Sequence, residues 1–225
     1  MTAGLRRFAA PARQARAAPE ERCELCGEEL PDQRYFSPRH RHLVDTESRS
    51  LACACQACAL LFTRPGGRYR TVPDRVRHDP DAPVTRAEWS GLGIPVGMAF
   101  FMINSALGRV VASYPSPAGA TECELDLTAW DRLAAVHPLL RAALPDVEAI
   151  MVVAAGHDTA ESGAGDSRVE VFLLPVDACY SLAGALRLNW HGFDGGAEGR
   201  RVVTDFLADA RSRSRPLAPG NESGE

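Results

Sequence analysis

The feature that most constrains the fold of this chain is the crowding of its cysteines. Five of the seven lie between positions 23 and 58, whereas Cys123 and Cys179 stand alone. The crowded segment holds two Cys-x-x-Cys pairs, each of which can turn tightly enough to direct both sulfur atoms at one point. The sequence therefore predicts a metal site formed by Cys23, Cys26, Cys55 and Cys58.

Disulfide bonds are the other common use of clustered cysteines, and they are expected in short secreted chains. No apolar signal segment precedes this cluster, and the pair Arg6-Arg7 is not followed by the hydrophobic region of an export signal. The longest apolar stretch, near residues 98–103, is too short to span a bilayer. We therefore expect a cytoplasmic protein with reduced cysteines, which either bind a metal or remain as metal-free structural thiols.

The identity of the metal is left open by a surplus of candidate ligands, because Cys53, His40 and His42 lie close to the two pairs in the sequence. One interpretation is a single zinc ion on the four paired cysteines, with Cys53 as a neighbouring thiol and the two histidines as loop residues. The other is iron, either a rubredoxin-like single ion or an iron-sulfur cluster with mixed cysteine and histidine ligands. On a strand, residues two apart share a face, so Cys53 is expected near Cys55, and His40 near His42.

Changes in composition along the chain predict five segments. They are a disordered Arg- and Ala-rich arm (1–20), a Cys/His metal-binding module (21–62), a connector (63–83), an α+β domain (84–213) and a disordered tail (214–225). The predicted fold class is α+β: a small zinc-ribbon or rubredoxin-like knuckle module, followed by an antiparallel sheet with helices on one face.

Within the α+β domain, alternating and periodic apolar residues predict two strand pairs, at 94–103 with 109–114 and at 147–154 with 168–176. A further short strand is expected near 123–127. Capping boxes at Thr85 and Thr128 are expected to begin two helices, and Asp177 to cap a third. A last helix is predicted over 198–213.

Other candidate functional residues are fewer. His191 and Asp194 lie in a Gly-rich segment that is either a partner-binding loop or a helix end followed by a turn. Cys123 and Cys179 fall on apolar patterns and are expected to pack in the core. All 25 positive charges are arginines, but the net charge is only −4 and no basic, aromatic recognition helix is present, so nucleic-acid binding is not expected. No catalytic motif is recognisable, so we expect a protein without enzymatic activity.

The combination of short motifs resembles a family of unknown function from actinobacteria, encoded beside high-affinity nickel-iron uptake hydrogenases. The resemblance is carried by the cysteine pairs and by the segments 40–45, 53–62, 92–101, 114–122, 175–180 and 190–196. It implies an accessory role in hydrogenase assembly or electron handling, with a hydrogenase subunit or maturation factor as partner.

These observations predict a zinc- or iron-binding accessory protein that acts through protein–protein contacts. The alternative is a rubredoxin-like or iron-sulfur electron-transfer protein of the same system, because iron on thiolate ligands permits one-electron transfer whereas zinc does not.

Overall fold

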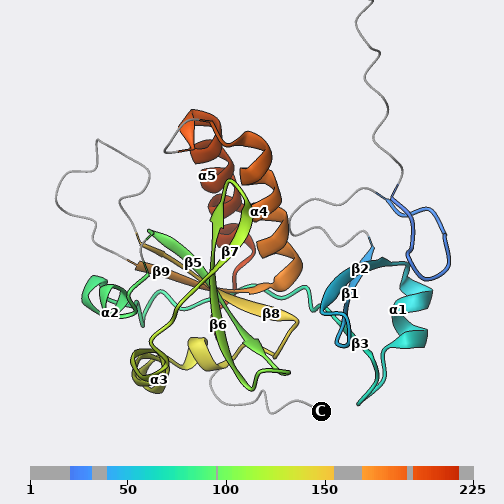
Figure 1. Cartoon of the computed structure of the whole chain (residues 1–225), viewed down its shortest axis with the longest axis horizontal. Helices are drawn as coiled ribbons and strands as arrows, with labels where there is room; N and C mark the ends of the chain where they lie inside the picture. The colour runs from blue at the N-terminus through green and yellow to red at the C-terminus, as the bar shows by residue number, and fades with distance from the viewer. Residues whose placement is uncertain (1–20, 32–39, 95, 155–168, 192–194, 218–225) are drawn as a thin grey trace, which may run out of the picture.

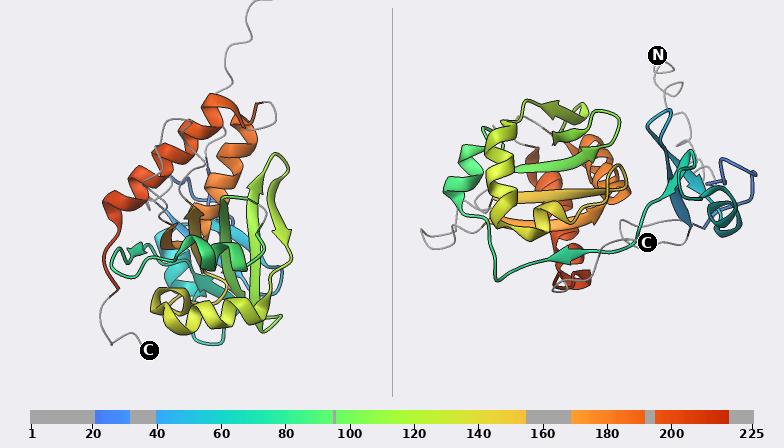
Figure 2. Two further views of the ribbon diagram at one scale, coloured as in Figure 1. Left: turned by 90° about the vertical axis from the view of Figure 1, so that its left-hand side faces the viewer. Right: turned by 90° about the horizontal axis from the view of Figure 1, so that it is seen from below.

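The structure is a computed structural model, and it describes residues 21–31, 40–94, 96–154, 169–191 and 195–217. These residues form two antiparallel sheets that lie side by side, a small one with the cysteine-rich segment and a larger one with most of the helices (Figures 1 and 2). Residues 1–20, predicted as a disordered arm, lie outside the described residues, as do residues 155–168, Asp194 and residues 218–225 of the predicted tail.

The small sheet has the strand order β2-β1-β3. Strands β1 (Arg41–Asp45) and β2 (Ser50–Ala54) form a hairpin, and β3 (Tyr69–Thr71) pairs with the other edge of β1. Helix α1 (Gln56–Phe62) begins one residue after β2 ends. The core of the small sheet consists of seven buried residues: Cys23, Cys55 and Cys58, together with Leu30, Leu43, Ala54 and Ala59.

The larger sheet has the strand order β4-β9-β8-β5-β6-β7. The expected hairpin is confirmed as β5 (Met98–Asn104) with β6 (Arg109–Ser116), and the second expected pair as β8 (Glu148–Ala154) with β9 (Val169–Pro175). The sheet is completed by β7 (Gly119–Cys123) and by β4 (Arg77–His78), which pairs with β9.

The α+β class with antiparallel sheets is confirmed, but helices cover both faces of the larger sheet rather than one (Figure 1). One face packs against α2 (Arg86–Gly91), α3 (Leu127–Val136) and the 3-10 helix η2 (Pro138–Arg141). The other packs against α4 (Val176–Asn189) and α5 (Gly196–Arg213). The physical reason is that every residue of β8 is buried, so both of its faces need apolar cover.

Two of the three predicted helix caps need correction. The capping box at Thr85 is present, with Thr85 Oγ1 accepting from Glu88 N at 3.2 Å. Helix α3 is instead capped by Asp126, whose carboxylate accepts from two backbone N–H groups, so Thr128 is not the cap. Helix α4 begins after Pro175, which places Asp177 inside the first turn.

The segment predicted as a connector, 63–83, contributes a strand to each sheet, namely β3 and β4. Between these strands, Arg75 forms a bidentate ion pair with Glu148 of β8, with N–O distances of 2.6 and 2.9 Å. Glu148 is completely buried and also accepts a hydrogen bond from Leu144 N. The chain is thereby clamped to the larger sheet directly after it leaves the small one.

The contact between the two sheets combines a small apolar cluster with polar pairs. Val44 and Val72 from the small sheet pack with Val147 and Val176 from the larger domain, and Leu51 and Met102 lie beside them. Arg70 on β3 contacts Asp146, and His42 on β1 contacts Asp177 on α4. The cysteine-rich segment is therefore fixed to the rest of the chain through β1 and β3.

Candidate metal centre

The first cysteine pair lies in a tight turn that precedes the small sheet. Gly27 N donates to Cys23 O at 2.7 Å, which closes the turn around Cys26. Gly27 itself has a φ of +79°, a left-handed conformation that glycine adopts without steric cost. The turn is held against β2 by Glu24, whose backbone N donates to Cys53 O and whose carboxylate accepts from Cys53 N.

The second cysteine pair lies where β2 passes into α1. Cys55 is the N-cap of α1, and its sulfur accepts a hydrogen bond from Cys58 N at 3.4 Å. Because a helix follows directly, the chain needs no left-handed residue here, which explains why Ala59 stands where the first pair has glycine.

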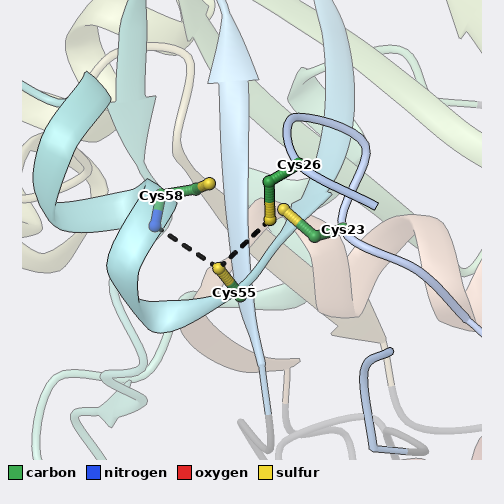
Figure 3. A group of neighbouring side chains, drawn as sticks. All are labelled: Cys23, Cys26, Cys55 and Cys58. Atoms are coloured by element: carbon green, nitrogen blue, oxygen red, sulfur yellow. Dashed lines mark hydrogen bonds between the residues drawn. The ribbon is translucent and has the colours of Figure 1, made fainter. Parts of the chain in front are cut away.

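The two pairs converge, so that the four sulfur atoms point toward one another from the turn and from the start of α1 (Figure 3). All four lie within 4.8 Å of one another, and Cys26 Sγ lies 3.8 Å from Cys55 Sγ. Tetrahedral zinc with Zn–S bonds of about 2.3 Å requires S···S distances of about 3.8 Å. The four cysteines can therefore hold one metal ion. Three of them are buried and Cys26 is exposed, which places the centre at the edge of the module.

The electrostatics of the four thiols differ. Burial raises the pKa of Cys23, but hydrogen bonds from the backbone N–H groups of Cys55, Leu25 and Cys26 outweigh that effect and lower it to about 6. Burial, together with the hydrogen bonds of the neighbouring cysteines, raises the pKa of Cys58 well above its usual range. One thiolate is thus stabilised by the protein alone, whereas Cys58 needs a nearby cation to ionise.

His40, His42 and Cys53 form a second group, separate from the four cysteines. His40 Nε2 lies 3.3 Å from His42 Nε2, so the two histidines are close together as expected, although His40 lies just before β1 begins. Cys53 pairs directly with His42 across the hairpin and lies with the histidines rather than with Cys55. The reason is that β2 ends at Ala54, so the alternation of the strand no longer governs Cys55.

Asp177, considered in the sequence only as a helix cap, belongs to this second group. Its Oδ2 lies 2.6 Å from His42 Nδ1, across a sequence separation of 135 residues. Burial lowers the pKa of His42, but the hydrogen bonds with Asp177 and Cys53 outweigh it and raise the pKa to about 9. No local pattern in the sequence could have indicated this contact.

The remaining candidates that the structure describes join neither group. His191 is exposed and its Nδ1 lies 3.0 Å from Asn189 O, at the end of α4, while Asp194 lies outside the described residues. Cys179 is buried against α5 and the sheet, and burial raises its pKa. Cys123 is half-buried and packs against the opposite face.

None of the helices that the structure describes has the length and apolar character needed to cross a bilayer.

Residues 22–214 match the profile of a family of unknown function (DUF5947), and the chain belongs to that family. No curated protein and no solved structure matches the chain.

Proposed function

We propose that this member of the family is a metal-binding accessory protein without enzymatic activity, in which four cysteines hold one structural metal ion. Zinc is the first candidate for that ion. The observation that carries the proposal is the convergence of Cys23 and Cys26 with Cys55 and Cys58. Four thiolates with no open position are typical of structural zinc sites, whereas catalytic sites keep a position for water or substrate.

The role of the ion follows from the small core around it. Three of the seven buried residues in that core are the ligands Cys23, Cys55 and Cys58, so few apolar groups remain to stabilise the fold. In small domains of this kind, structural zinc supplies about 10–16 kcal/mol toward folding. The ion would therefore shape the module, including the surface of α1 beside it.

That surface is suited to contact with a protein. Helix α1 continues from Cys58 into Leu60, Leu61 and Phe62, which are 72%, 75% and 46% exposed. Consecutive large apolar side chains at the surface are characteristic of protein contacts. The proposed partner is a subunit or maturation factor of a nickel-iron hydrogenase, which rests on the resemblance of the sequence motifs alone.

The second candidate is electron transfer by iron on the same four cysteines. It is favoured by Cys26, the exposed ligand, which would give an electron a short path from the ion to a partner. Backbone N–H groups donating to Cys23 would also stabilise the charge of an iron–thiolate centre and tune its potential.

Metal analysis combined with a visible absorption spectrum of protein purified with and without air tests both candidates. A colourless protein with zinc on the four cysteines supports the accessory role, and a coloured, reducible iron centre supports electron transfer. Cys26→Ser should abolish the metal at this site, whereas the matched Cys123→Ser, far from both groups, should retain it. Unchanged metal content in Cys26→Ser would contradict the four-cysteine assignment.

A further inference from the structure

His40, His42 and Cys53 form a group of metal-ligating side chains that the four-cysteine site does not use. It is built on the small sheet rather than on a surface loop, since His42 lies on β1 and Cys53 on β2. Only 1% of the His40 side chain and 14% of the His42 side chain are exposed. A buried pair of imidazoles beside a thiol requires a physical explanation.

The backbone of the hairpin brings the thiol to the histidines. His42 and Cys53 are direct partners, and the backbone N and O of Cys53 are directed at Glu24 rather than at β1. Cys53 and His42 therefore form a non-hydrogen-bonded pair, the type in which Cα atoms are only about 4.5 Å apart and side chains lie closest. His40 precedes His42 by two residues and reaches the same side.

The hydrogen bonds of the two rings determine where their lone pairs point. His40 Nδ1 lies 3.1 Å from Pro31 O, and His42 Nδ1 lies 2.6 Å from Asp177 Oδ2. Carbonyl and carboxylate oxygens only accept, so each Nδ1 carries a hydrogen, and it is the Nε2 atom of each ring that can bind a metal ion once it has lost any proton of its own. These two Nε2 atoms face each other at 3.3 Å, an arrangement that repels unless a proton or a metal ion lies between them.

From this geometry we infer that His40 Nε2, His42 Nε2 and Cys53 Sγ form a second metal site, which binds a divalent first-row transition ion. With Zn–N bonds of about 2.0–2.1 Å, two nitrogens of a tetrahedral site lie about 3.3 Å apart, which agrees with the distance between the rings. The three ligand atoms lie within 4.8 Å of one another. A carboxylate or carbonyl on the second nitrogen of each ligating histidine is the usual way in which proteins orient such ligands.

The ligand set also indicates what kind of site this is. Two imidazoles and one thiolate suit zinc, iron, cobalt or nickel, whereas magnesium and calcium prefer oxygen. No fourth His, Cys, Asp or Glu atom joins the group within the described part of the chain, and Asp177 is already held by His42 and by Ala178 N. Among the described residues the fourth position is thus left to water or an external ligand, so this ion is exchangeable, whereas the four-cysteine ion has a complete set of protein ligands.

Equilibrium dialysis of the full chain against buffered free zinc, followed by metal analysis, tests the number of sites. We expect two zinc ions per chain in the unaltered protein, one in His40→Gln and one in Cys53→Ser. Cys26→Ser with Cys58→Ser should also bind one, which separates this proposal from the four-cysteine proposal. One zinc in the unaltered protein, with no loss in His40→Gln or Cys53→Ser, would overturn the second site and indicate that the rings share a proton instead.

A more conservative substitution tests the site even if the ligand variants fail to fold. Asp177→Asn should keep two sites but weaken zinc binding at the second by about 10- to 100-fold, because the carboxylate no longer orients His42. The matched control is Asp205→Asn on the exposed face of α5, which should leave both affinities unchanged. If Asp177→Asn binds both ions as tightly as the control does, Asp177 has no positioning role and the site as described is incorrect.

Discussion

Gly27 shows how one residue can control the geometry of the four-cysteine centre. Its φ of +79° lies in the left-handed region, and a Cβ at this position would meet no atom within 4 Å. The requirement for glycine is therefore conformational rather than steric, and it sets the direction in which Cys26 leaves the turn.

Gly27→Ala is expected to cost about 1–2 kcal/mol in the folded, metal-bound state, equivalent to roughly a five- to thirty-fold increase in the zinc dissociation constant. Competition with a chelator measures this change. Gly184→Ala is the matched control, because Gly184 is an exposed residue inside α4 with open space around it. That substitution should stabilise the protein by about 0.5–1 kcal/mol without changing zinc affinity, and equal zinc affinities in the two variants would refute the conformational argument.

At this scale the four-cysteine group could be predicted from the sequence, because Cys-x-x-Cys spacing determines local turn geometry. The separation of Cys53 from Cys55 could not, since it depends on the residue at which the strand ends. The role of Asp177 could not be predicted either, because its contact with His42 depends on how the two sheets pack.

At the scale of elements, the start of α3 differs from the start that the capping-box pattern in the sequence predicts. Thr128 and Asp131 have the spacing of a capping box, yet the Asp126 carboxylate accepts from the N–H groups of Thr128 and Ala129 at 2.9 and 3.0 Å. Asp126, two residues before Thr128, accepts hydrogen bonds from the N–H groups at the start of the helix. The helix therefore begins before Thr128 rather than after it.

Asp126→Ala should therefore destabilise the protein by about 1 kcal/mol, whereas Thr128→Ala should change stability by less than about half of that. Urea unfolding monitored by tryptophan fluorescence is suitable, because Trp130 on α3 is buried in the core. A larger loss in Thr128→Ala than in Asp126→Ala would mean that the cap lies where the sequence pattern places it.

Most strands and helices of the larger sheet were predictable to within a few residues because their apolar periodicity is long and regular. The strand expected near 123–127 was placed wrongly, since β7 ends at Cys123 and Leu127 already begins α3. Strands β3 and β4, with three and two residues, are too short to carry such a pattern. The helices on the second face were missed although the sequence held a signal, the uninterrupted apolar run from Ala149 to Ala154 in β8.

At the scale of the whole molecule, the ion pair of Arg75 with Glu148 fastens the chain between the two sheets. Arg75→Ala would leave a completely buried carboxylate without its guanidinium partner, so it should cost about 3–5 kcal/mol of unfolding free energy. Arg109→Ala removes an exposed pair with Glu122 and should cost less than about 1 kcal/mol. Urea titration compares the two, and similar losses would show that the buried pair does not act as a clamp.

Metal removal tests how far the two sheets depend on each other. All three tryptophans, Trp89, Trp130 and Trp190, lie outside the cysteine-rich module, so their fluorescence follows the larger domain alone. The buried residues of the small sheet lie mostly around the cysteines, whereas the larger sheet has an apolar core on each face. Chelation should therefore expose residues 21–62 to proteases while the tryptophan emission stays close to that of the metal-bound protein.

The contact between the two sheets determines how much the larger domain is destabilised when the metal is removed. It consists of a few valines, the pair of Arg70 with Asp146, and the pair of His42 with Asp177. So small an interface contributes little to the stability of the larger domain. The melting temperature of the larger domain should therefore fall only slightly on chelation. Simultaneous loss of tryptophan signal and of protease resistance in the module would instead mean that the two sheets unfold as one cooperative unit, with the metal centre supporting both.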